Sequence, residues 1–98
     1  MKFMVHWTIH ADKRHQVLEQ FAQMPFEAYM KHQGEKIKVF GRWHDLVRLQ
    51  GWGLVETDDT EALQRWLLQW NSALDIDVAP VVDDEEAHAI ANRFLAAR

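Results

Sequence analysis

The strongest constraint on the fold is the spacing of apolar side chains, which changes along the chain between alternation at every second residue and the spacing of a helix. Four segments alternate apolar and polar side chains, as strands do: residues 2–9, 36–44, 49–57 and 73–82. Two stretches between them repeat apolar side chains at helical spacing: residues 12–24 and 58–70. Only a short polar link separates the second alternating segment from the third, so these two are expected to form a hairpin.

The order strand, helix, strand, strand, helix, strand is the split βαβ pattern of ferredoxin-like folds. It predicts an α+β sandwich in which right-handed crossovers place both helices on one face of a four-stranded antiparallel sheet. A further helix with an apolar stripe is expected after residue 83. With 98 residues and no repeat or linker, the whole of 1–98 is expected to form one domain.

Acidic residues stand where each helix should begin. Asp12 is expected to cap the first helix, Asp58 and Glu61 have the spacing of a capping box, and Asp83 with Glu86 should cap the last helix. The acidic clusters before the later helices are therefore interpreted as caps rather than calcium ligands.

Pro25 interrupts the first helical stripe. It either kinks that helix or opens a short second helix through Phe26, Tyr29 and Met30. Gly34 is expected to end this region before the second strand begins.

Composition excludes several classes of function. The formal net charge is -4 and the 11 Lys and Arg residues form no run, so a nucleic acid is not expected as a partner. The chain has no cysteine, which excludes disulfides, thiolate catalysis and iron–sulfur clusters. No apolar run approaches the roughly 20 residues that span a bilayer, and residues 1–7 lack the features of a signal peptide. We therefore expect a cytoplasmic protein with no membrane partner and no bound cofactor.

The hairpin register decides which side chains occupy the sheet face that the helices leave open. We assume pairs whose residue numbers sum to about ninety-four, which places Val39, Gly41 and Trp43 on the helix side. Arg42 then faces Trp52 on the open side. With the first strand added, the open face would carry a mixture of apolar and chemically capable residues: Met4, His6, Thr8, Phe40, Arg42, His44, Trp52, Leu54 and Glu56.

Two histidines on this face are candidates for catalysis. His6 and His44 could act as general base and acid near neutral pH, or as nitrogen ligands of a metal. Without a third ligand at a recognisable spacing, we predict no metal site. Asp45 follows His44 directly and is expected to begin the turn rather than to orient the imidazole.

Three further residues are candidates for ligand binding: Thr8, Arg42 and Trp52. Arg42 could capture a carboxylate or an enolate, or it could simply stack on Trp52. Trp52 could form one wall of a pocket or anchor an interface. The other tryptophans, Trp7 and Trp43 among them, are expected in the core.

The segments "MKFMVHWTI", "GRWHD", "GWGLVETDDTEALQRWLLQW" and "DIDVAPVVDDEEA" resemble the short bacterial family known as domain of unknown function 3303. That family is placed with the dimeric α/β-barrel superfamily, so the resemblance implies a homodimer in which two open sheet faces meet. It implies no reaction and no catalytic residues. Relatives in the superfamily include cofactor-free monooxygenases and isomerases, a range that warns against reading function from fold.

Three functional hypotheses remain open, and whether the protein is an enzyme is not decided by the sequence. The first is a small-molecule site in the cavity between the sheet and its dimer partner. The second is a homodimeric interaction module without a ligand. The third is a cofactor-free monooxygenase-like or isomerase-like enzyme, as some members of the superfamily are, in which the open-face candidates His6 and His44 would carry out the chemistry.

Overall fold

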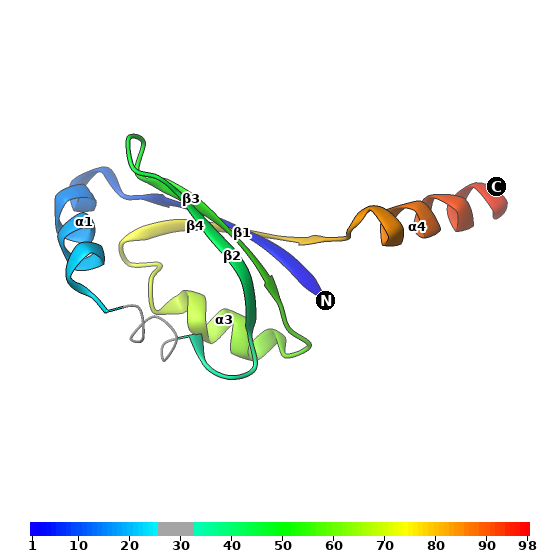
Figure 1. Cartoon of the computed structure of the whole chain (residues 1–98), viewed down its shortest axis with the longest axis horizontal. Helices are drawn as coiled ribbons and strands as arrows, with labels where there is room; N and C mark the ends of the chain where they lie inside the picture. Colours follow the sequence, from blue (N-terminus) through cyan, green and yellow to red (C-terminus); the bar gives the residue numbers. More distant parts are fainter. Residues whose placement is uncertain (26–32) are drawn as a thin grey trace.

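The structure, a computed structural model, describes residues 1–25 and 33–98 (Figure 1). The described elements are β1 (Lys2–Ile9), the short 3₁₀ helix η1 (Ala11–Lys13), α1 (Arg14–Gln23), β2 (Lys38–Asp45), β3 (Gln50–Glu56), α3 (Thr60–Leu68), β4 (Leu74–Val81) and α4 (Asp84–Ala96). The boundaries of β1 agree with the predicted alternating segment.

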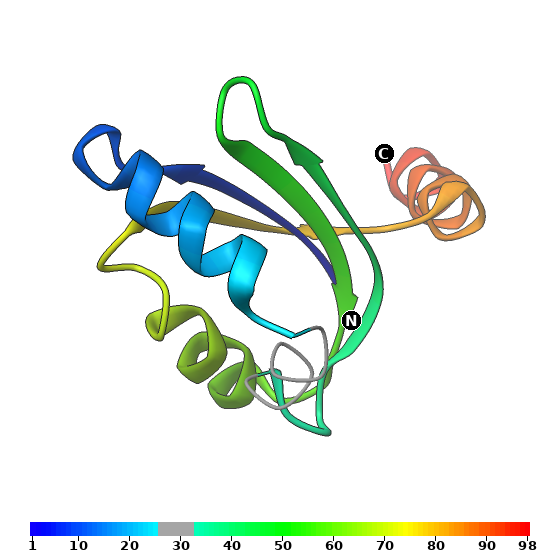
Figure 2. The same cartoon turned by 60° about the vertical axis from the view of Figure 1, so that its left-hand side comes forward.

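The four strands form one sheet in the order β2-β3-β1-β4, and every neighbouring pair is antiparallel. This is the topology of a ferredoxin-like fold, so the α+β sandwich predicted from the sequence is confirmed. Helices α1 and α3 lie next to each other on one side of the sheet (Figure 2). We call this side the helix face and the other side the open face.

The core lies between the helix face and α3. Phe3 and Val5 of β1, Val55 of β3 and Leu63 of α3 are buried there, together with Ile37 just before β2. The alternation of β1 explains this directly, because every second side chain points to the same face of a strand.

The helix starts follow the predicted acidic residues in part. Asp12 lies in η1, and α1 begins without a side-chain cap, so the predicted cap at Asp12 is wrong. The cap of α3 stands one position later than predicted, where Asp59 accepts a hydrogen bond from the backbone N–H of Ala62. Asp83 accepts a hydrogen bond from the backbone N–H of Glu86 at 2.8 Å, which confirms the predicted cap of α4.

Pro25 stands just beyond the end of α1. The helix ends at Gln23, and Met24 has extended backbone angles, as expected for a residue that precedes proline. The alternative short helix through Phe26, Tyr29 and Met30 lies outside the described residues. Gly34 has a φ of +83°, a backbone conformation that glycine adopts more easily than other residues.

The β2–β3 hairpin contains a β-bulge that the sequence analysis did not anticipate. The assumed register is correct at the end of the hairpin that lies away from the turn. Here Lys38 lies opposite Glu56 and Val39 lies opposite Val55. A shift at Phe40 then changes every later pair by one residue.

The pairs beyond the bulge were therefore predicted wrongly. Trp43 lies opposite Trp52 on the open face, whereas Arg42 and His44 lie opposite Gly53 and Gly51 on the helix face. A one-residue change of register sends each side chain to the other side of a sheet.

The space beside Gly51 explains this register. A Cβ atom at Gly51 would overlap ring atoms of Trp7, so the Trp7 indole already fills the helix face at this point. A second indole does not fit there, and Trp43 instead covers Gly41 on the open face, where its side chain is 57% exposed. The prediction that Trp43 belongs to the core is wrong for this reason.

Helix α4 projects away from the rest of the molecule as an arm (Figure 1). The chain measures 52 × 28 × 19 Å and has a radius of gyration of 16.0 Å. A compact domain of this length would have a radius of gyration of about 13 Å. None of the helices in 1–25 and 33–98 has the length and hydropathy needed to cross a membrane.

Candidate functional site

On the open face, His6 is held by contacts on three sides. Its ring stacks on Trp52 with a centroid distance of 5.0 Å and an interplanar angle of 18°. Its Nε2 lies 3.1 Å from Oε1 of Gln50, and its Nδ1 lies 3.9 Å from a carboxylate oxygen of Asp77. Cross-strand neighbours on β3 and β4 supply these partners, since His6 lies opposite both Trp52 and Asp77.

The network continues from Gln50 to the hairpin turn. The side-chain amide of Gln50 donates to Asp45 Oδ2 at 3.4 Å, and Asp45 Oδ1 accepts hydrogen bonds from the backbone N–H groups of Val47 and Arg48. These bonds to the carboxylate lower the pKa of Asp45, the contact with Arg48 being the largest cause. Asp45 therefore begins the turn, as predicted.

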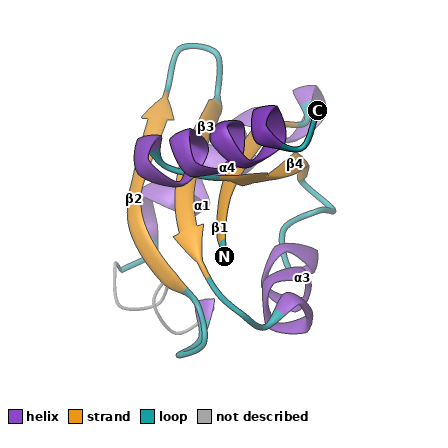
Figure 3. Cartoon of the chain, turned by 90° about the vertical axis from the view of Figure 1, so that its right-hand side faces the viewer, coloured by secondary structure: helices purple, strands orange, loops and turns teal. Residues whose placement is uncertain are grey.

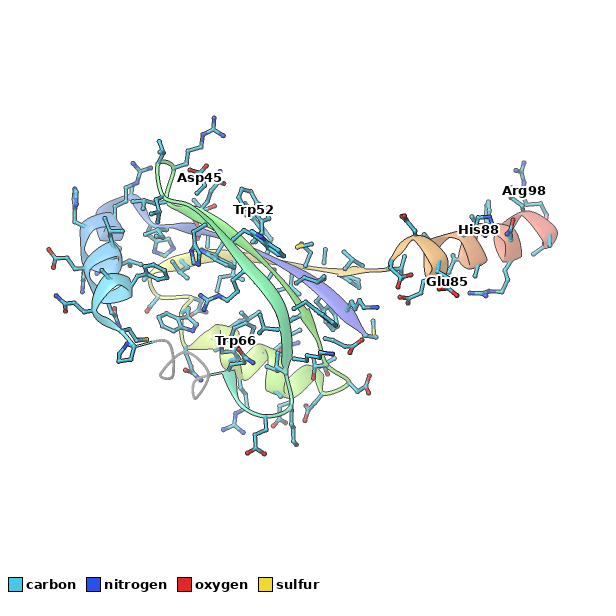
Figure 4. The ribbon with its side chains drawn as sticks, in the orientation of Figure 1. Asp45, Trp52, Trp66, Glu85, His88 and Arg98 are labelled. Atoms are coloured by element: carbon cyan, nitrogen blue, oxygen red, sulfur yellow. The ribbon has the colours of Figure 1, made fainter. Side chains whose placement is uncertain are left out.

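The open face also carries exposed aromatic rings. Phe40, Trp43 and Trp52 are 44%, 57% and 37% exposed, and we call these three residues the aromatic patch. Figure 4 shows Trp52 on the opposite side of the sheet from Trp66 of α3. Thr8 lies on the same open face, beside Gln50 of β3 and Asp75 of β4.

On the helix face, a cavity of about 120 Å³ lies between the sheet, α1 and α3. We call it the helix-face cavity. Most of its wall is apolar, with contributions from Trp7, Ile9, Val17, Leu18, Phe21, Trp66, Leu67, Trp70 and Ile76. An apolar cavity of about 150 Å³ can hold a benzene molecule, so this one matches a single small ring.

Arg42 and His44 form part of the wall from β2. The His44 ring packs against two aromatic rings, Phe21 at a centroid distance of 4.8 Å and Trp7 at 5.6 Å. The guanidinium carbon of Arg42 lies 5.7 Å from the centre of the Trp7 ring. Arg42 therefore does not stack on Trp52, which was one of the two alternatives. It contacts Trp7 on the helix face instead.

The pKa of His44 lies below the ordinary value of 6.5. Partial burial of the ring is the main cause, although the residue keeps an exposed surface, and the positive charge of Arg42 lowers the pKa further. A neutral imidazole has one nitrogen that donates and one that accepts. Within 1–25 and 33–98, neither ring nitrogen of His44 has a hydrogen-bond partner.

The structure thus divides the predicted site residues between two faces. His6, Thr8 and Trp52 lie on the open face, whereas Arg42 and His44 line the helix-face cavity. The two imidazoles are separated by the sheet, so they do not meet in one site within a single chain. In the part of the chain that the structure describes, no three His, Asp or Glu side chains gather in a group that could hold a metal ion.

Sequence reasoning missed the helix-face cavity because its wall consists of ordinary core residues. The apolar stripe of residues 12–24 predicted a helix but gave no sign that this helix leaves space beneath it, and no residue of α1 is buried. The pair Trp7 and Gly51 is the signal that could have revealed the site. The Trp7 ring fills the space over Gly51, so Trp43 has no room on the helix face and its neighbours Arg42 and His44 lie there instead.

Comparison with known proteins identifies a family and adds no activity. No protein of curated function matches the chain. Among solved structures, the crystal structure of SCO4226 from Streptomyces coelicolor A3(2) is similar, with 20% sequence identity and a TM-score of 0.49. The match covers 85% of this chain and 100% of the Streptomyces chain. The family model described as domain of unknown function (DUF3303) matches residues 1–95, and the chain therefore belongs to this family.

Proposed function

We propose that the protein binds a small organic acid in the helix-face cavity, with its apolar part between α1 and the sheet and its carboxylate at Arg42 and His44. The observation that carries the proposal is a guanidinium and an imidazole side by side on the wall of an otherwise apolar cavity. Pockets for small molecules combine a mostly apolar lining with a few polar groups in this way.

The two side chains would have different roles. Arg42 would supply charge-assisted hydrogen bonds to the carboxylate. His44 would donate a hydrogen bond or accept one from a hydroxyl group of the ligand, because its neutral ring offers both. This site replaces the cavity between the sheet and its partner that the sequence analysis favoured, since β2 turns both side chains toward the helices.

Benzoate is a suitable probe, with benzamide as its neutral counterpart of the same shape. Trp7, Trp66 and Trp70 line the cavity, so binding should change the intrinsic fluorescence. We expect saturable binding of benzoate and weaker binding of benzamide. Replacing Arg42 removes a charged hydrogen bond, so R42L should weaken benzoate binding by about tenfold to a hundredfold.

The control variant is R48L, which removes an arginine from the exposed hairpin turn. It should bind benzoate like the unchanged chain. R42L should leave benzamide binding nearly unchanged, because no charge is lost in that complex. The proposal fails if neither compound changes the fluorescence, or if R42L weakens both compounds equally.

A second candidate function is favoured by the aromatic patch. We infer that the open face forms a homodimer interface, because aromatic residues are enriched at the centres of protein interfaces. In this arrangement Trp52 is an anchor rather than a ligand-binding residue. Sedimentation equilibrium tests the inference, and a chain that stays monomeric at millimolar concentration contradicts it.

A further inference from the structure

Helix α4 is amphipathic, and no other element in 1–25 and 33–98 covers its apolar stripe. Its apolar stripe consists of Ala87, Ile90, Ala91, Phe94 and Leu95, and all of these side chains are exposed. Ile90, Phe94 and Leu95 are 46%, 64% and 57% exposed. An isolated helix shorter than about 12 to 15 residues is marginal in water, and α4 has 13 residues. Stable helix formation therefore calls for a surface that covers the stripe.

The start of α4 is fixed in a direction that leads away from its own sheet. The Lys2 ammonium lies 3.2 Å from Glu86 Oε1 and 3.5 Å from Asp83 Oδ2. The Asp83 cap adds a hydrogen bond at the same point. These contacts join the first turn of α4 to the start of β1, and Figure 3 shows α4 in front of the strands, with the sheet behind it.

The open face of a second copy has suitable dimensions for this helix. Thirteen residues of α-helix are about 20 Å long. The eight residues of β1 or β4 span about 26 Å. The helix therefore fits along the strands of a sheet face that has its own exposed apolar surface, the aromatic patch.

Two-fold symmetry sets the direction in which the arm would run. A two-fold axis perpendicular to the strands reverses the strand direction, so an arm that continues β4 would run parallel to the partner's β1. It would begin near Lys2 of the partner subunit and end near the opposite edge of that sheet.

The charges agree with this direction. The first turn of α4 is acidic, and the edge where it would begin carries Lys2 and Lys38 with Glu56 between them, which leaves one net positive charge. The last turn carries Arg93, and the opposite edge carries Asp75 and Asp77, whose side chains are 81% and 89% exposed. Complementary charges of this kind fix the register of an interface. Figure 4 shows Arg98 at the far end of the arm.

We propose that the two copies of the homodimer exchange their C-terminal arms, with the apolar stripe of each α4 covering the open face of the other copy. This inference rests on the proposed homodimer. A four-stranded face about 26 Å long and about 19 Å wide offers about 500 Å², and an arm that lies on it covers about 200 Å² of that area.

The first experiment measures the dimer dissociation constant by sedimentation for F94D and for N92D. Phe94 belongs to the apolar stripe, whereas Asn92 lies on the polar side of the same helix, where it contacts His88. We expect F94D to weaken the dimer at least about thirtyfold, as for an anchor residue of an interface, and N92D to leave it unchanged. Neither change touches the core, so both variants should keep the near-ultraviolet circular dichroism of the unchanged chain.

The second experiment decides whose open face the arm covers. The chain has no cysteine, so an introduced cysteine is unique. A chain with A97C, at the end of the arm, is mixed with a larger tagged chain that carries D77C on the open face. A short bifunctional thiol reagent should join the two different chains. The control pair, A97C with E19C on the exposed side of α1, should not be joined.

The outcomes separate the two proposals. A monomeric chain overturns both the homodimer and the exchange of arms. A dimer whose dissociation constant is unchanged by F94D overturns the exchange alone. A chain that carries both A97C and D77C and is cross-linked only within itself also overturns the exchange, because the arm would then cover its own sheet.

Discussion

At the scale of single residues, His44 shows how position changes the chemistry of a side chain. On the helix face its ring lies against Trp7 and Phe21 with Arg42 nearby, so it is partly covered although the residue is exposed. Both burial and a neighbouring positive charge disfavour the imidazolium form. The sequence marked His44 as a candidate for acid–base chemistry but placed it on the open face, because the face depends on one additional residue in the strand.

This environment makes stability depend on pH. The pKa of His44 is lower in the folded chain than the ordinary value of 6.5. Just below pH 6.5 the unfolded chain therefore binds a proton that the folded chain does not bind, and acid favours unfolding. Stability should fall as the pH decreases from about 7 to about 5, and H44Q should reduce this loss. Urea unfolding midpoints test this, with H88Q as the exposed control. Equal pH slopes in the unchanged chain and H44Q would refute it.

At the scale of elements, the strands and the turn of the β2–β3 hairpin could be predicted from the sequence, but its bulge could not. The two strands, their pairing and the turn at Asp45 follow from alternation and turn chemistry, which are local properties. The bulge at Phe40 depends on the Trp7 ring filling the space above Gly51, and Trp7 comes from another strand. A contact between distant parts of the chain thus decided the face of Arg42 and His44.

Two glycines of β3 provide a matched test of this packing. A Cβ atom at Gly51 would overlap the Trp7 ring and would lie 2.7 Å from the backbone oxygen of Trp43, so G51A should destabilise the fold by about 1–3 kcal/mol. At Gly53 the nearest atoms would be 3.6 Å away, and G53A should be neutral or slightly stabilising. Denaturant unfolding measures both. If the two variants are equally stable, the close packing of Trp7 on Gly51 is not what sets the register.

At the scale of the whole molecule, topology was predictable and assembly was not. The order of hydrophobic periods was enough to predict the sheet order, because few connections are compatible with it. The stripe of α4 predicted a helix, but a stripe does not identify the surface that covers it. The projection of α4 became visible only in the folded chain, where Lys2 holds its first turn.

If the open face and α4 are covered in a homodimer, unfolding should depend on protein concentration. Dissociation accompanies unfolding of such a dimer, so each tenfold increase in concentration adds about 1.4 kcal/mol to the free energy of unfolding. The thermal midpoint of the full chain should rise accordingly. Calorimetry over a hundredfold range of concentration tests this, and a constant midpoint would count against the homodimer.

The bulge at Phe40 also affects how this chain should be compared with its relatives. A relative that lacks one residue at this point could keep the letters "GRWHD" and still present the arginine and the histidine to the opposite side of its sheet. A sequence alignment would then suggest a shared function, although the arginine and the histidine would line a cavity in one protein and lie on the opposite face of the sheet in the other. In this chain, one inserted or deleted residue in β2 would change the wall of the cavity as much as a substitution of Arg42 or His44 would.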